Sequence, residues 1–127
     1  MFSVLVIENN EFFRKSFAGM LKNHMPALVI EDAGDGYEAI EKIDSKVPDI
    51  IFLDIRLPGK NGLELTKEIK TRYPETKIGI FSNLDLPEYR NSASKCGADY
   101  FLDKSSLCCT DIVALIEGLL VSKNSGA

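Results

Sequence analysis

Residues 49–62, which read DIIFLDIRLPGKNG, decide the fold and place one acid at the end of an apolar segment. Residues 50–53 are apolar with no polar alternation, which is typical of a central parallel strand that is covered on both faces. The strand must end near Asp54, because Pro58 lacks an N–H and the two glycines that follow favour a turn. Ligands of open α/β sheets bind where the strands end. Asp54 is therefore a candidate site residue, and the alternative is that it only caps the strand or the turn.

Length and composition indicate one globular domain. The chain has 127 residues, 45% hydrophobic and 27% charged, which is enough to bury a single core without disulfides. The net charge is −4 and the 15 Lys and Arg residues are scattered, which argues against direct nucleic-acid binding by this domain. No signal peptide or membrane-spanning segment is recognisable, so we expect no membrane contact and a cytoplasmic location. Three cysteines, two of them adjacent, predict reduced thiols rather than a disulfide framework.

Strand and helix signals alternate five times along the chain. Short apolar runs indicate strands, and each run is followed by a segment that favours a helix. The helix at 86–96 has few apolar residues and several weak helix formers, so we expect it to be the most mobile helix. The expected strands are residues 3–8, 28–31, 50–54, 77–82 and 99–102, and the expected helices are residues 13–24, 37–43, 63–73, 86–96 and a last one capped by Ser105 or Ser106.

Five strand–helix units in sequence predict an α/β fold with a parallel sheet, right-handed crossovers and helices on both faces. The expected architecture is a flavodoxin-like, doubly wound (βα)5 domain whose five-stranded sheet has the order 2-1-3-4-5. We expect residues 1–121 to form this domain and residues 122–127 to be a polar tail or the start of a linker. The expected order puts strands one and three side by side. Glu8 and Asp54 would then meet at one rim of the sheet.

Polar side chains are expected at the carboxyl ends of four strands. Because these ends share one rim in a parallel sheet, the polar groups would form one site. Carboxylate and amide oxygens suit Mg²⁺, while an ammonium and a hydroxyl suit a phosphoryl group. A carboxylate that attacks phosphorus forms an aspartyl phosphate, so Asp54 is the candidate nucleophile. The candidate site residues are Glu8, Asn9, Asp54, Ser82 and Lys104.

Five features in this order resemble the receiver domain of bacterial two-component response regulators over residues 2–121. Each feature is weak alone, but the ordered set is specific. The matching features are Glu8 after strand one, AGDGYEA at 33–39, DIRLPGKNG at 54–62, Ser82 at the end of strand four and GADYFLDK at 97–104.

The resemblance implies roles for individual residues. Asp54 would accept a phosphoryl group from a histidine kinase or a phosphotransfer protein, and Lys104 would pair with the phosphate. Ser82 would be the switch hydroxyl and Phe101 the switch aromatic side chain. The metal ligands that the resemblance implies are Glu8, Asn9, Asp54 and the backbone carbonyl of Arg56.

The resemblance also implies how such a domain communicates. A receiver is a phosphoacceptor that catalyses its own phosphorylation and dephosphorylation and is not a classical enzyme. Phosphorylation would reshape the surface formed by helix four, strand five and helix five, which would engage an output domain or protein. A phosphorylation-dependent homodimer is a further expectation.

Two positions depart from the family pattern. The family has two acids after strand one, whereas this chain has Glu8 followed by Asn9, which keeps an oxygen but loses a charge. Two unit charges about 4 Å apart interact by about 4 kcal/mol at an effective dielectric constant of about 20, so we expect weak Mg²⁺ binding. Ser105 stands where proline is common after the lysine, and it permits a trans peptide bond there.

Two alternative functions follow from these residues. The first is a degenerate receiver that binds its partners without being phosphorylated, because Asn9 replaces an acid of the metal site. The second is metal-dependent nuclease chemistry on a similar sheet. It is disfavoured because Arg56 stands where a second acid would be needed.

Overall fold

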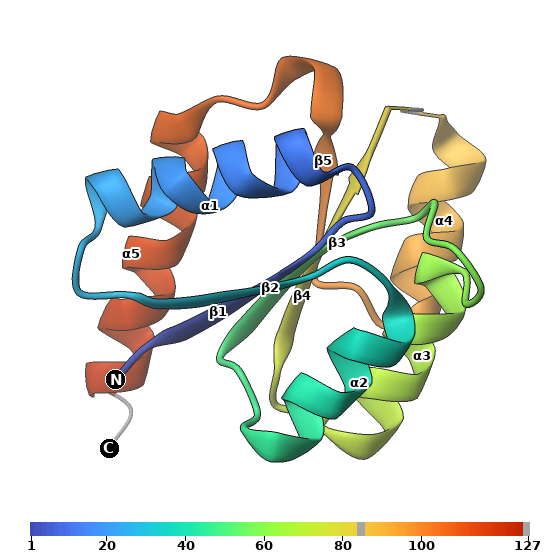
Figure 1. Ribbon diagram of the computed structural model, residues 1–127, viewed down its shortest axis with the longest axis horizontal. Helices are drawn as coiled ribbons and strands as arrows, with labels where there is room; N and C mark the ends of the chain where they lie inside the picture. The colour runs from blue at the N-terminus through green and yellow to red at the C-terminus, as the bar shows by residue number, and fades with distance from the viewer. Residues whose placement is uncertain (84–85, 126–127) are drawn as a thin grey trace.

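The fold is a five-stranded parallel sheet between two layers of helices (Figure 1). The computed structural model describes residues 1–83 and 86–125. The sheet order is β2-β1-β3-β4-β5 and every strand pair is parallel, which confirms the predicted flavodoxin-like architecture. The elements are β1 (Ser3–Ile7), α1 (Glu11–His24), β2 (Val29–Ala33), α2 (Gly36–Ser45), β3 (Ile50–Asp54), α3 (Gly62–Arg72), β4 (Lys77–Ser82), α4 (Pro87–Cys96), β5 (Tyr100–Asp103), the 3₁₀ helix η1 (Lys104–Ser106) and α5 (Cys109–Ser125).

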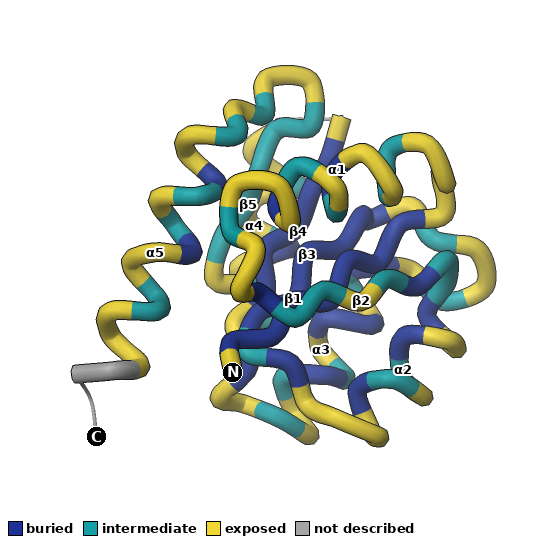
Figure 2. Tube along the Cα trace, turned by 60° about the vertical axis from the view of Figure 1, so that its left-hand side comes forward, coloured by how far each residue is buried: buried dark blue, intermediate teal, exposed yellow. Residues whose placement is uncertain are grey.

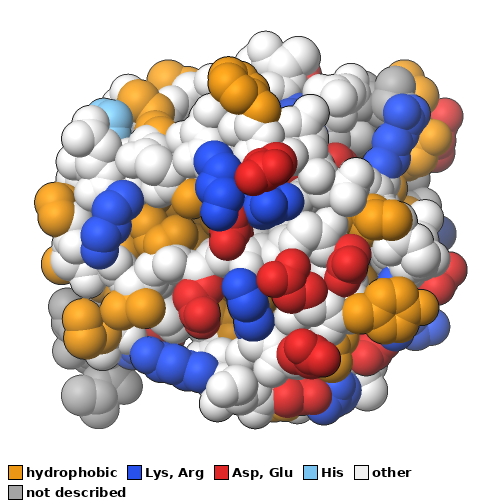
Figure 3. Space-filling view, in the orientation of Figure 1, with side chains coloured by type: hydrophobic (Ala, Val, Ile, Leu, Met, Phe, Trp, Pro, Cys, Tyr) orange, Lys and Arg blue, Asp and Glu red, His pale blue; other side chains and the backbone are white. Residues whose placement is uncertain are grey.

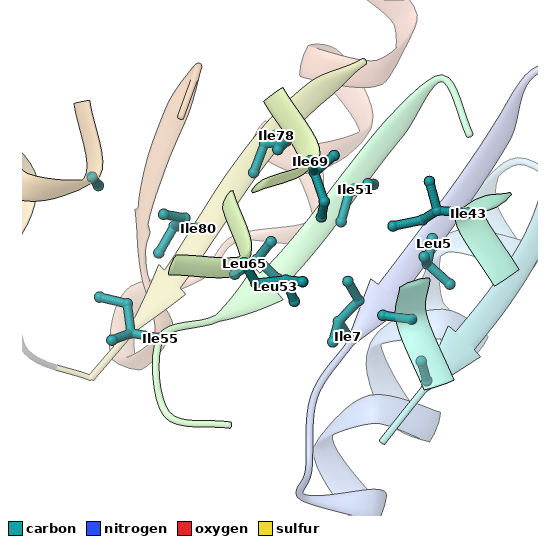
Figure 4. Close-up of a cluster of buried hydrophobic side chains, with 13 residues drawn as sticks. Leu5, Ile7, Ile43, Ile51, Leu53, Ile55, Leu65, Ile69, Ile78 and Ile80 are labelled. Carbon is teal, nitrogen blue, oxygen red and sulfur yellow. The ribbon is translucent and has the colours of Figure 1, made fainter. Parts of the chain in front are cut away.

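Each face of the sheet has its own hydrophobic core. Helices α1 and α5 cover one face, and α2, α3 and α4 cover the other (Figure 1). Successive strand side chains point to opposite faces, so Val6 of β1 belongs to the α1/α5 core and its neighbour Ile7 to the other. Figure 4 shows Leu65 and Ile69 of α3 lying over the strand side chains of this second core. Burial is concentrated in the central strands (Figure 2), as expected for strands covered on both sides.

The register of the strands aligns their carboxyl ends. Ile7 of β1 lies opposite Leu53 of β3, and Asp54 lies opposite Phe81 of β4. Glu8 is the first residue after β1, and its backbone N–H still donates to a carbonyl of β2. Parallel strands that end together present their last side chains along one rim, which is where the site forms.

Short polar side chains start three of the helices that surround this rim. The N-cap residues Asn10, Asp35 and Asn61 accept backbone N–H groups in the first turns of α1, α2 and α3. Each cap satisfies one of the N–H groups that a helix start leaves unpaired. The loops after β1, β2 and β3 are thereby fixed in place.

Helix α4 is the least anchored of the helices. Its N-cap residue, Leu86, makes no side-chain cap hydrogen bond, and Ala93 is the one buried residue of the helix. It ends at Gly97, whose φ of +104° is the left-handed conformation that glycine adopts without strain. The thin apolar face that the sequence predicts is therefore confirmed, and the mobility of α4 stays a prediction.

The start of the last helix differs from the sequence prediction. Neither Ser105 nor Ser106 caps α5, because the Asp103 side chain accepts both the N–H and the hydroxyl of Ser105 and draws these residues into η1. Helix α5 begins at Cys109 and continues to Ser125, beyond its last apolar stripe residue. Strand β2 also differs, because it begins one residue later and ends two residues later than the expected strand at 28–31. Its pairing with β1 continues to Ala33.

Four further observations concern the described residues. No helix among them is long and apolar enough to cross a membrane. All their peptide bonds are trans, including the one that precedes Ser105. Cys96, Cys108 and Cys109 are free thiols, as predicted. On the face shown in Figure 3, acidic and basic side chains are interspersed rather than separated into patches of one sign.

Candidate functional site

Two carboxylates and one ammonium meet at the rim. Glu8 directly follows β1 and Asp54 is the last residue of the neighbouring strand β3. The two residues are only 2% and 9% exposed, respectively. The Lys104 ammonium contacts the Glu8 carboxylate and lies 3.3 Å from Asp54 Oδ2. The lysine side chain is itself only 11% exposed, so these charges interact with little water between them. The structure thus brings together three of the residues that the sequence singles out.

A close backbone contact fixes the loop after Asp54. The Gly62 N–H donates to the carbonyl of Ile55 at 2.8 Å, which folds the loop back onto the end of β3. A Cβ on Gly62 would overlap the Asp54 carbonyl oxygen and lie 2.7 Å from Ile55 Cα, so only glycine fits. The Arg56 N–H approaches Asp54 Oδ1 at 3.3 Å. The turn after β3 thus holds the Asp54 carboxylate at the rim and leaves its other oxygen to Lys104.

A pocket of about 210 Å³ opens beside Asp54 toward β4 and α4. Asp54, Ser82 and Tyr89 line it, together with the loop residues Arg56 and Asn61 among others. Ser82 is buried, as its place at the end of a central strand requires. The pocket is large enough for a phosphoryl group and reaches from the carboxylate to the strand that carries the hydroxyl.

Asn9 and Arg56 are the two weaker parts of the predicted metal site. Asn9 is exposed, and its amide nitrogen donates to the carbonyl of Gly34 at 3.4 Å. Arg56 is exposed and lines the pocket beside Asp54. Among the described residues, no group of three or more His, Cys, Asp or Glu side chains is arranged to hold a metal. A hard cation at this rim would therefore rely on two carboxylates, an amide oxygen and a backbone carbonyl.

Phe101 lies half-buried on β5 and packs against the α2/α3/α4 core. The Arg90 guanidinium of α4 lies 4.8 Å from the centre of its ring, which is the distance of a cation–π contact. The predicted switch aromatic residue is therefore held by the least anchored helix of the fold.

Three ion-paired residues near the rim escaped the sequence prediction. Arg14 donates to the carbonyl of Glu8 at 2.7 Å and to the Asp32 carboxylate at 3.0 Å, and Lys15 also pairs with Asp32. Burial opposes ionisation of Asp32, but hydrogen bonds from Lys15 and Arg14 outweigh it and lower the pKa of this carboxyl group. Arg14 therefore links the backbone of Glu8 to Asp32, near the end of β2. The basic pair at 14–15 and an acid ending strand two were the available signals.

Phe13 has the helical spacing of a core residue and packs against the α1/α5 core. Its ring centre lies 4.3 Å from the Lys104 ammonium, so it belongs to the site as well as to the core. A phenylalanine one turn into a helix that starts at the rim was the available signal, but helical spacing alone does not separate these two roles.

Comparison with known proteins decides the family. The model of the response regulator receiver domain matches residues 4–116, which is most of the chain. This chain belongs to the response regulator receiver domain family. Receiver domains relay signals from histidine kinases to output domains and are generally not classical enzymes. Phosphorylation, and Mg²⁺ at the phosphorylation site, are typical of the family.

Relatives and solved structures agree with this assignment. The transcriptional regulatory protein DegU of Brevibacillus brevis is 32% identical over 98% of this receiver and 51% of its own length. The oxygen regulatory protein NreC of Staphylococcus epidermidis is 33% identical over 81% and 48%, respectively. The receiver thus spans about half the length of these two relatives. A two-component response regulator from Clostridium difficile has a TM-score of 0.89 at 26% identity, covering 98% of this chain and 99% of its own.

Proposed function

We propose that Asp54 accepts a phosphoryl group from a histidine kinase or a phosphotransfer protein. The observation that carries this proposal is the buried Asp54 carboxylate, which shares the Lys104 ammonium with Glu8 at the mouth of a phosphoryl-sized pocket. A carboxylate oxygen of Asp54 attacks phosphorus, and the donor's P–N or P–O bond breaks with its electron pair leaving on the donor. The product is an acyl phosphate on Asp54. Water later hydrolyses this bond and restores the carboxylate.

In the proposed mechanism, Lys104 and Ser82 stabilise the transferring group. The ammonium pairs with one phosphoryl oxygen, and the Ser82 hydroxyl donates to another. Lys104 is already held within 3.3 Å of Asp54, so little rearrangement is needed before the reaction. The domain therefore catalyses the formation and loss of its own acyl phosphate.

We further propose that Mg²⁺ binds at this rim with low affinity. Glu8, Asn9, Asp54 and the backbone carbonyl of Arg56 would hold the ion. The oxygen donors suit Mg²⁺, and the ammonium shared by the two acids shows that this rim attracts positive charge. Bound Mg²⁺ offsets the repulsion between the carboxylate and the incoming phosphoryl group.

The proposed output is a population shift at the surface formed by α4, β5 and α5. Phosphorylation draws Ser82 toward the acyl phosphate and lets Phe101 turn inward from its half-buried position against Arg90. An output domain or protein that prefers one of these two states reads the signal, and a second phosphorylated copy is another candidate partner. We take residues 1–121 as the receiver domain, and helix α5 continues past this boundary to Ser125.

A degenerate receiver is the second candidate function, and the exposed amide of Asn9 is the observation that favours it. Such a domain would bind its partner without phosphorylation. Because Asn9 carries no charge, Glu8 and Asp54 alone form the anionic part of the proposed site.

One phosphotransfer assay separates the two candidate functions. The receiver is incubated with acetyl phosphate or a phosphohistidine donor, with and without Mg²⁺, and acyl phosphate formation is followed by intact mass. Label on wild type that disappears in Asp54→Ala and increases with Mg²⁺ is expected. Absence of label on folded wild type at high Mg²⁺ would favour the degenerate receiver, and label that persists in Asp54→Ala would exclude Asp54 as the acceptor.

A further inference from the structure

The Lys104 ammonium has a third neighbour besides the two carboxylates. Its nitrogen lies 4.3 Å from the centre of the Phe13 ring, within the range of a cation–π contact. Such contacts strengthen when the cation is shielded from water, and the lysine side chain is only 11% exposed. The ring therefore contributes to where the ammonium rests.

The position of the Phe13 ring is itself tightly fixed. The Phe13 N–H donates to the side chain of the N-cap residue Asn10 at 3.0 Å, which sets the backbone at the start of α1. The ring lies edge-on to Phe81 at 5.4 Å and stacks with Phe17 at 6.1 Å. Phe17 and Phe81 in turn pack on Phe52, so Phe13 is the outermost ring of a four-ring cluster.

This cluster joins the lysine to the strand ends of the site. Phe81 lies opposite Asp54 in the sheet and directly precedes Ser82. A ring wedged between Phe81 and the ammonium therefore has one side on the scaffold of the acceptor and the other on the phosphate-pairing group. A lysine side chain has four rotatable carbon–carbon bonds, so such a support restricts it substantially.

We propose that Phe13 is a positioning residue that holds the Lys104 ammonium beside Asp54 through the face of its ring. The inference rests on the proposed phosphorylation of Asp54 and adds a residue that the sequence assigns to the core. The ammonium can shift by an ångström or two toward a phosphoryl oxygen and remain within about 6 Å of the ring, so the support persists during the reaction.

The kinetic test compares Phe13→Leu, Phe13→Tyr and the matched control Phe2→Leu, with acetyl phosphate as the donor at saturating Mg²⁺. Leucine keeps apolar bulk but removes the ring face, so we expect phosphorylation to slow about three- to tenfold in Phe13→Leu. Phe13→Tyr keeps the ring and should stay within about twofold of wild type. Phe2 is buried in the same α1/α5 core but lies outside this cluster, next to the start of β1, so Phe2→Leu should lower stability while leaving the rate within about twofold.

A second set of measurements separates positioning from packing. Protons above an aromatic ring resonate upfield, so the ε-methylene signals of Lys104 should move downfield in Phe13→Leu and stay in place in Phe2→Leu. In a Lys104→Met background, Phe13→Leu should no longer change the rate. Unmoved Lys104 signals, equal slowing by the two leucine variants, or an undiminished effect in Lys104→Met would each overturn the inference. If wild type is not phosphorylated but the Lys104 signals still shift in Phe13→Leu, the phosphorylation proposal is refuted and the contact between Phe13 and Lys104 is supported.

Discussion

Two aspartates flank the central strand β3, and their surroundings differ sharply. Asp49 enters the strand, and its carboxylate accepts the Ser3 N–H at 2.8 Å and the Lys123 ammonium at 2.8 Å. Asp54 leaves the strand, is more buried, and shares one lysine with Glu8. Asp49 therefore has partners that balance its charge, whereas the Asp54 end of the strand carries two carboxylates for one ammonium.

This difference separates a structural acid from the proposed phosphoacceptor. At the Asp49 end, each hydrogen bond links segments that are far apart in sequence and so stabilises the fold. At the Asp54 end, two carboxylates share one ammonium, and the excess negative charge favours the arrival of a cation. Locally unfavourable interactions of this kind are common at functional sites.

The largest expected effect is that alanine at the two positions has opposite consequences for phosphorylation and for stability. Asp54→Ala should abolish acyl phosphate formation and change the free energy of unfolding by less than about 1 kcal/mol, since Lys104 keeps Glu8 as its partner. Asp49→Ala should remain labelled and lose about 1–3 kcal/mol, because the Ser3 N–H loses its acceptor. Urea unfolding and intact-mass labelling check both. A strongly destabilised Asp54→Ala would remove the contrast.

The next effect concerns the loop that positions Asp54. Gly62→Ala places a methyl group against the Asp54 carbonyl oxygen and Ile55 Cα, so we expect a loss of about 2–4 kcal/mol in unfolding free energy. Gly19→Ala is the control, because a Cβ there meets no atom within 4 Å and alanine favours a helix by up to about 1 kcal/mol. Equal stabilities of the two variants would show that the loop is freer than the structure indicates.

A third prediction adds charge to the rim. Asn9→Asp supplies a further carboxylate to the proposed metal site, and we expect Mg²⁺ affinity to rise about ten- to a hundredfold. Asn10→Asp is the matched control, because aspartate still caps α1 and places the same charge one residue away. Its affinity should change by less than about threefold. Titration followed by NMR shifts measures both, and equal affinities for wild type and Asn9→Asp would refute the prediction.

The smallest effect is the pH dependence of the Asp49 end. Burial opposes ionisation of Asp49, but hydrogen bonds from Lys123 and Ser3 prevail and lower its pKa below 3.8. A carboxyl group whose pKa is lower when folded stabilises the protein above its unfolded pKa and loses that effect as the pH falls through the folded value. The stability difference between wild type and Asp49→Asn should therefore be constant above about pH 5 and shrink below about pH 4. Urea unfolding across this range measures it.

The sequence predicts the five strand–helix units and the strand ends from local patterns, and it predicts the strand order only as the usual arrangement of five such units. The apolar run before Asp54 and the turn residues after it place the acid without knowledge of any contact. The predicted start of α5 was wrong because Ser105 donates hydrogen bonds to the Asp103 side chain and does not cap α5. Hydrophobic periodicity does not show which of these two local arrangements a serine adopts. The contact of Phe13 with Lys104 joins residues 91 positions apart (104 − 13), and only the folded chain reveals it.

Helix α4 contributes to the core one buried residue, Ala93, and the partly buried ring of Tyr89. A segment with so little buried surface separates from the rest of the protein at a fraction of the free energy of global unfolding. Its amide hydrogens should accordingly exchange with deuterium well before those of α3. A partner that binds α4 would therefore act on a part of the chain whose expected local opening leaves the sheet that carries Asp54 folded.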